Sequence, residues 1–198
     1  MIDISREPRH VSRPTDISQP ATTDFTRALL AIHASLLLHA RVLSQLKASD
    51  YTMNPCGPVK SSIASHTRHT LDHVEALLHA VQTGVVNFDH RERNTSVETD
   101  LTVALTALDD LLRRVHHAAM NPPTADATWA MSTIFTEGGA PARMLTSPVR
   151  EAAFVLSHTI HHHAILGIMA RAVGAILPER FGYAPSTPSL AEPSPCAR

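Results

Sequence analysis

Apolar residues recur at three- and four-residue steps in four long stretches of the chain, which is the spacing of one buried face of an α-helix. The stretches cover residues 23–47, 58–83, 95–120 and 147–176. Four amphipathic helices of similar length in one chain predict an all-α protein, with a four-helix bundle as its architecture.

Residues that favour helix ends lie where these stretches begin or stop. Gly84 follows the second stretch, and glycine readily adopts the left-handed conformation that ends a helix. Thr95 and Glu98 form a T-x-x-E capping box at the head of the third. Ser147 precedes the fourth as a cap, with Pro148 at the first helical position.

The segment 124–147 lacks a helical period. Apolar and polar residues alternate from Trp129 to Phe135, and Gly138-Gly139 follows, which predicts a small β-hairpin or irregular insert before the last helix. Residues 1–21 are predicted to be a disordered N-terminal arm, residues 22–177 the helical domain, and residues 178–198 a proline-rich C-terminal tail.

Composition removes several classes of function. The formal net charge is −1, so neither a nucleic-acid footprint nor a polybasic membrane surface is expected. The apolar run 164–177 is too short to span a bilayer and contains Arg171. The first residues lack the apolar core of a signal peptide, and Cys56 and Cys196 form no disulfide framework, which together favour the reducing cytosol.

The chemistry concentrates in the stretch SHTIHHH, residues 157–163, which holds His158, His161, His162 and His163. On a helix, residues four apart lie on one face, and His158 and His162 fall on the inward stripe of the fourth helix. His161 lies at the edge of that stripe. The pair is placed to bind one metal ion, although core histidines bonded to neighbouring groups would show the same pattern.

A catalytic metal site commonly uses three protein ligands, so a third should come from another helix. The second predicted helix offers His66, His69 and His73, and periodicity alone does not choose among them. Neither HExxH nor a pair of ExxH motifs is present, which argues against a common metalloprotease and against a ferritin-like di-iron centre.

The spacing of these residues resembles that of the DinB/YfiT-like superfamily, whose members include mycothiol- and bacillithiol-linked transferases. Ser62-Ile63 matches the start of that family's second helix, His69 follows Ser62 by seven residues, and Asp72 completes an H-x-x-D step. The HxxxH of the last helix is matched by His158 and His162. The resemblance covers about residues 22–177, and Ser61 replaces the tryptophan that the family has at this point.

The resemblance implies a DinB-like four-helix bundle in which His69, His158 and His162 bind one divalent metal. Zinc, nickel and iron all accept imidazole ligands. It further implies a homodimer and a metal-dependent transferase or hydrolase reaction on a small, thiol-bearing molecule.

Four more residues are candidates for the site. Asp72 could support a ligand imidazole or a metal-bound water, or it could pair with Arg68 on the helix surface. His90, Arg91 and Arg93 could bind an anionic substrate, or they could belong to a solvated charged loop.

Two alternative functions follow from the same residues. The first is a non-catalytic metal- or haem-binding or stress-response protein whose histidines store or sense a ligand. The second is a metal-free helical interaction domain with hydrogen-bonded core histidines. An open coordination position favours catalysis, and a site filled by protein nitrogens favours storage.

Overall fold

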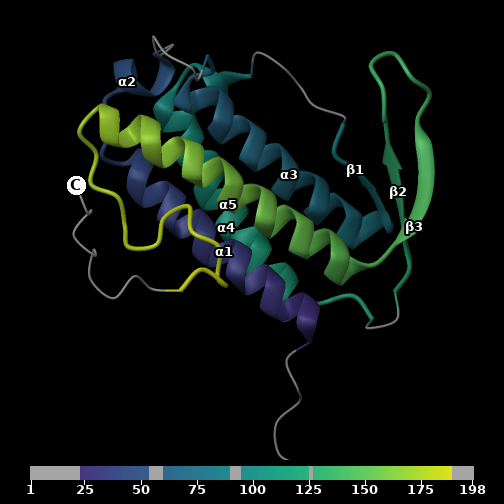
Figure 1. Ribbon diagram of the computed structural model, residues 1–198. Coiled ribbons are helices and arrows are strands. Elements are labelled where there is room, and N and C mark those ends of the chain that lie inside the picture. Colours follow the sequence, from purple (N-terminus) through teal and green to yellow (C-terminus); the bar gives the residue numbers. More distant parts are fainter. Residues whose placement is uncertain (1–22, 54–59, 90–94, 125–126, 189–198) are drawn as a thin grey trace, which may run out of the picture.

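The computed structural model describes residues 23–53, 60–89, 95–124 and 127–188 (Figure 1). The predicted arm 1–21 and the end of the tail lie outside these residues. The elements in chain order are α1 (Asp24–Leu43), α2 (Ala48–Thr52), α3 (Ile63–Thr83), β1 (Val85–Asn87), η1 (Ser96–Glu98), α4 (Leu101–Met120), β2 (Trp129–Thr133), β3 (Ala142–Thr146) and α5 (Pro148–Ala172).

Short polar side chains cap the long helices. The hydroxyl groups of Thr23, Ser62 and Ser147 each accept a hydrogen bond from the backbone N–H three residues later. Gly84 ends α3 in the left-handed conformation, with φ +70°. These side chains satisfy N–H groups that the first turn of a helix leaves unpaired, which is why the predicted starts near Thr23 and Ser147 are observed.

The third long helix begins later than predicted. Thr95 and Glu98 do not form a capping box, and a short 3-10 helix, η1, occupies this position. Asp100 caps α4 instead, accepting hydrogen bonds from the N–H groups of Thr102 and Val103. Glu98 is paired with Arg68 of α3, so its carboxylate is used between elements rather than within one.

The four long helices pack around one core (Figure 1). α1 contacts α4 and α5, and α3 contacts the same two helices from the other side. By length and composition α1 alone among the described helices could span a membrane. Its apolar residues Phe25, Leu29, Ile32 and Leu36 are buried against the neighbouring helices, whereas Leu30 and Leu37 are exposed.

The prediction of an all-α four-helix bundle is wrong, because the chain also forms a three-stranded mixed sheet beside the helices (Figure 1). The hairpin expected before the last helix forms from the antiparallel strands β2 and β3. β1 then pairs in parallel with β2, aligning Val86 with Met131. This third strand was missed because parallel pairing joins residues distant in sequence, and three residues are too few to show an alternating pattern.

The last helix ends at Ala172, although apolar residues continue to Ile176. The chain then turns back over the helices without forming a further helix or strand up to residue 188. Gln45 holds this return through two hydrogen bonds with the backbone of Ile176, both 2.9 Å long. Phe181 is buried and stacks on His163, with ring centroids 4.5 Å apart.

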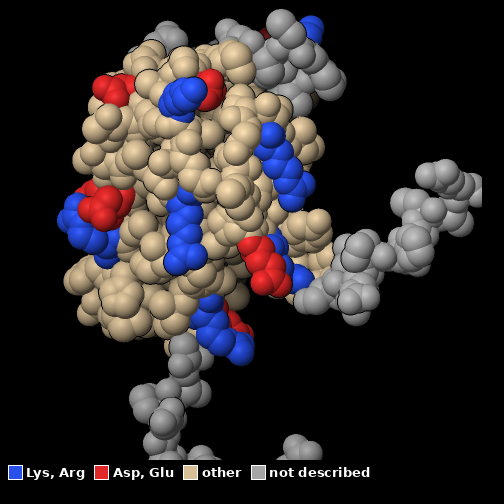
Figure 2. All heavy atoms as spheres, turned by 90° about the vertical axis from the view of Figure 1, so that its left-hand side faces the viewer, with Lys and Arg blue, Asp and Glu red and all other residues tan. Residues whose placement is uncertain are grey.

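Charged side chains are scattered over the face shown in Figure 2, and neither sign gathers into a continuous patch there. Many pair along the exposed surface, as Arg114 does with Glu75 of α3 and Asp110 of its own helix. This distribution agrees with the near-zero formal charge of the chain.

Candidate metal centre

Three imidazole rings from two helices meet between α3 and α5. Nε2 of His158 lies 2.9 Å from Nε2 of His69 and 3.1 Å from Nε2 of His162. One nitrogen of each residue lies within 4.8 Å of the others, so the three could hold one metal ion. His158 and His162 share a face of α5 because they are four residues apart, and the packing of α3 against α5 adds His69.

The spacing of these nitrogens suits a single ion. Two imidazole nitrogens bound to one tetrahedral zinc ion at about 2.0–2.1 Å lie roughly 3.3 Å apart. The observed Nε2 separations of 2.9 and 3.1 Å need to open by only a few tenths of an ångström. Three neutral nitrogen donors are also a ligand set that transition metals accept. The residues therefore fit a metal with three protein ligands.

Burial keeps His162 neutral. Desolvation, followed by the neighbouring charges of His158, His66, His161 and His73, lowers the pKa of His162 to about 3. Its lone pair is consequently free of protons across the physiological range, and a metal would not have to displace one from this ring.

The ring of His158 is held by aromatic packing. It stacks on His73, with centroids 4.0 Å apart, and on Phe154, with centroids 5.6 Å apart. His73 also stacks on Phe88 and donates its Nδ1–H to the carbonyl oxygen of His69 over 2.9 Å. In this arrangement His73 supports a candidate ligand, whereas the sequence left it open as a ligand itself.

The other histidines near the centre occupy different positions. Nδ1 of His66 lies 3.0 Å from Nδ1 of His162, which is the ring nitrogen of His162 that faces away from His158. His161 is exposed, and its ring centroid lies 5.2 Å from that of His162. Of the three histidines that the sequence offers on α3, only His69 brings a nitrogen to the cluster of three.

Asp72 lies beside His69 in sequence but forms an ion pair with Arg68. The Nη1–Oδ2 distance is 2.7 Å, and Arg68 also reaches Glu98 with its Nε at 2.9 Å. Both carboxylates and the guanidinium are largely covered, so Arg68 ties η1 to α3. The predicted alternative for Asp72, a pair with Arg68, is what the structure shows.

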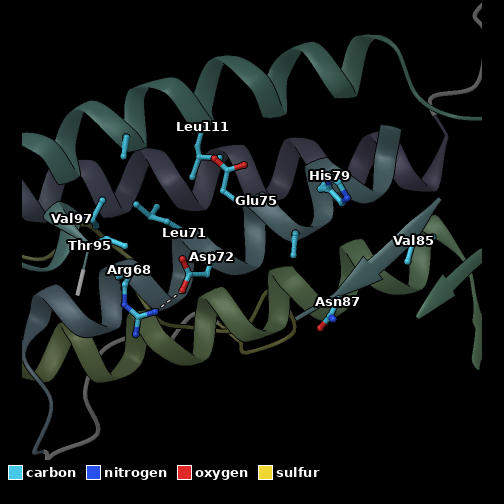
Figure 3. A pocket seen from close by; sticks show the side chains of 12 residues that line it. Arg68, Leu71, Asp72, Glu75, His79, Val85, Asn87, Thr95, Val97 and Leu111 are labelled. Carbon is cyan, nitrogen blue, oxygen red and sulfur yellow. Dashed lines mark hydrogen bonds and ion pairs between the residues drawn. The ribbon is translucent and has the colours of Figure 1, made fainter. Parts of the chain in front are cut away.

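A cavity of about 700 Å³ lies along this neighbouring face of α3 (Figure 3). Arg68, Asp72, Glu75 and His79 line it from one helix face, and β1, η1 and α4 supply the rest of the wall. None of the three candidate ligands belongs to the described lining. The cavity and the metal centre therefore occupy adjacent faces of α3.

The candidate anion-binding residues His90, Arg91 and Arg93 lie outside the described residues. Asp89, which precedes them, accepts a hydrogen bond from the backbone N–H of Ile134 over 2.7 Å. This contact connects the end of β1 to the end of β2.

A second pair of histidines lies deep in the core and was not found from the sequence. Nε2 of His163 is 3.3 Å from Nδ1 of His39, and Nε2 of His39 is 3.1 Å from the Thr67 hydroxyl. Both rings are buried, and desolvation lowers the pKa of His39 to about 3. His39 lies among leucines on α1, and its sequence context shows no sign that its partners are on α3 and α5.

The comparisons with known proteins give no relative. No protein-family model, no curated protein and no solved structure matches the chain. The arrangement of His69, His158 and His162 is thus the observation from which a function is argued.

Proposed function

We propose that the protein binds one divalent metal ion through His69, His158 and His162 and uses it in a transfer or hydrolysis reaction on a small molecule. The observation that carries this proposal is the meeting of three imidazole nitrogens from α3 and α5 within 4.8 Å of one another. Three protein ligands leave at least one position of a four-coordinate ion open, which is the usual arrangement in catalytic zinc sites.

An ion held by neutral imidazoles keeps its full positive charge, and this charge lowers the pKa of a bound water or thiol towards neutrality. The chain's own contribution is to hold the three rings in place. Stacking of His73 and Phe154 on His158 restricts that ring, and the covered position of His162 keeps water from competing for its nitrogen.

The resemblance to the DinB/YfiT-like superfamily, carried by Ser62, His69, Asp72 and the HxxxH of α5, makes a thiol-bearing small molecule our proposed substrate class. Zinc, nickel and iron are the candidate metals, because all three accept imidazole ligands. The proposed substrate class rests on motif spacing alone.

Metal analysis of the purified full-length chain tests the proposal. After growth in metal-replete medium we expect about one divalent ion per wild-type chain and almost none for the double variant His158→Ala/His162→Ala. Equal metal content in the two proteins would reject the site. A folded wild type without metal that also fails to take up added zinc, nickel or iron would favour the interaction-domain alternative.

A further inference from the structure

The two nitrogens of His162 face different partners. Nε2 lies 3.1 Å from Nε2 of His158, inside the cluster of candidate ligands. Nδ1 lies 3.0 Å from Nδ1 of His66, which belongs to the second turn of α3. The His66 and His162 rings are 5.2 Å apart between centroids and tilted by 43°, so this contact is an edge contact between nitrogens rather than a stack.

The positions of the hydrogens follow from this geometry. A neutral imidazole carries one N–H, and a nitrogen that binds metal must offer its lone pair. If Nε2 of His162 binds metal, its hydrogen is on Nδ1 and points at Nδ1 of His66. That atom of His66 must then accept, and the hydrogen of His66 must reside on its own Nε2.

Histidine ligands in metal sites usually donate their second N–H to a carboxylate, a backbone carbonyl or a water. This acceptor orients the ring and makes it a better ligand. Among the described residues, the hydrogen-bond partner of Nδ1 of His162 is the imidazole of His66. Nδ1 of His66 is engaged in that contact, and its Nε2 is buried without a hydrogen-bond partner among the described residues. Neither nitrogen belongs to the group of three that could hold one ion.

We infer that His66 is a positioning residue of the metal centre, which accepts the Nδ1–H of His162 and thereby selects the tautomer whose Nε2 can bind metal. This inference rests on the proposed metal site. It also assigns a separate task to each histidine on this face of α3. His69 supplies a ligand nitrogen, His73 stacks on His158, and His66 orients His162.

Two substitutions with opposite hydrogen-bonding capacity test this role. His66→Leu removes the acceptor, and we expect it to weaken Zn²⁺ binding roughly 10- to 100-fold in a competition titration with a chromogenic chelator. His66→Asn places an amide oxygen near the position of Nδ1, and we expect an affinity within a few-fold of wild type. His161→Leu is the matched control, because its ring is beside His162 without a hydrogen bond to it, and it should bind as wild type does.

Nitrogen-15 NMR of zinc-loaded wild-type protein with labelled histidines determines which ring nitrogen carries the hydrogen, without any substitution. We expect hydrogen on Nδ1 of His162 and on Nε2 of His66, with Nδ1 of His66 unprotonated. This measurement decides the question even if His66→Leu fails to fold, which circular dichroism of the metal-free variants would reveal.

The outcomes separate the inference from the function on which it rests. A wild type that binds none of zinc, nickel and iron, or binds them independently of His158, rejects the proposed function. A wild type that needs His158 for Zn²⁺ while His66→Leu binds equally well overturns only the role of His66. Equal weakening by His66→Leu and His66→Asn also overturns it, as does a hydrogen on Nδ1 of His66 in the zinc-loaded protein.

Discussion

Nε2 of His69 lies 2.9 Å from Nε2 of His158, although the two residues are 89 positions apart in the chain. His69 is on α3 and His158 on α5, so the contact exists only when these helices pack in the observed register. A metal that binds both rings would connect two of the long helices, and its binding should therefore affect both local chemistry and global stability.

The first prediction separates His69 from His73, its neighbour on the same helix. His69→Ala should weaken Zn²⁺ binding more than roughly 100-fold, beyond the 10- to 100-fold loss typical of a residue that only supports a ligand. His73→Ala removes the ring stacked on His158 and should fall within that smaller range. Chelator competition measures both.

His79→Ala provides the control for this pair of substitutions. His79 is an exposed residue of α3 that lines the neighbouring cavity, so its loss should leave Zn²⁺ affinity unchanged. If His73→Ala weakens Zn²⁺ binding as much as His69→Ala or more, the ligand from α3 is His73, one turn after His69.

The second prediction concerns the effect of metal on unfolding. Free Zn²⁺ at about 100 times its dissociation constant should stabilise the native state by about 2.7 kcal/mol, because the unfolded chain cannot hold α3 and α5 together. For a chain of this size that corresponds to a rise in Tm of about 5–10 °C. Thermal unfolding by circular dichroism measures the shift, and EDTA should reverse it. His158→Ala/His162→Ala should show no shift.

Part of the site could be predicted from the sequence because it lies within single helices. The spacing of His158 and His162 determines that they share a face, and the apolar stripe of α5 indicates that this face is covered. The choice of His69 came only from motif spacing, since helix phase also admits His66 and His73. Which ring meets which depends on how far α3 slides along α5, and side-chain periodicity contains no such information.

The fold also divides into features set by neighbouring residues, which the sequence shows, and contacts between distant segments, which it does not. The helix ends at Gly84 and Ser147 depend on a few neighbouring residues and were visible in the sequence. The predicted start of the second helix after Pro58 was wrong, because Ser62 caps it and α3 begins at Ile63. The pairing of Val86 with Met131 and the contact between His39 and His163 join distant segments, so neither could be read from local pattern. A pair of Arg68 with Asp72 one turn away was one of the two alternatives for Asp72, whereas the pair of Arg68 with Glu98 depends on where η1 folds.

The third prediction is a loss of stability in mild acid caused by His39. Its pKa is about 3 in the folded chain, because burial disfavours the charged ring, against an ordinary value of 6.5. The unfolded chain therefore takes up a proton below pH 6.5 that the folded chain refuses until about pH 3. The resulting stability is fully present above pH 6.5 and falls by about 1.4 kcal/mol per pH unit below it.

His39→Gln tests this prediction, since glutamine does not titrate and can still donate to Thr67. Urea unfolding in EDTA at pH 7 and pH 5 should show wild type losing about 2 kcal/mol more than the variant. His163 faces His39, and its pKa is lowered first by burial and then by His39, so the variant keeps the burial part of the His163 contribution and loses the part due to His39. Equal losses would mean that His39 is protonated in the folded chain at pH 5.

The fourth prediction concerns the C-terminal segment that packs over α5. Gly182 has φ +79°, and a Cβ built there would lie 2.7 Å from the backbone of Ala164. Gly182→Ala should therefore cost roughly 2 kcal/mol or more of folding stability, from backbone strain together with overpacking, and should loosen the stacking of Phe181 on His163.

Gly174→Ala is the matched control, because Gly174 has φ +88° but nothing within 4 Å of its Cβ position, so only the strain of about 1 kcal/mol applies. The difference between the unfolding free energies of the two variants in urea measures the cost of the close contact between a Cβ at position 182 and the backbone of Ala164. If both lose the same stability, Gly182 is needed for its conformation alone, and the segment does not depend on tight contact with α5.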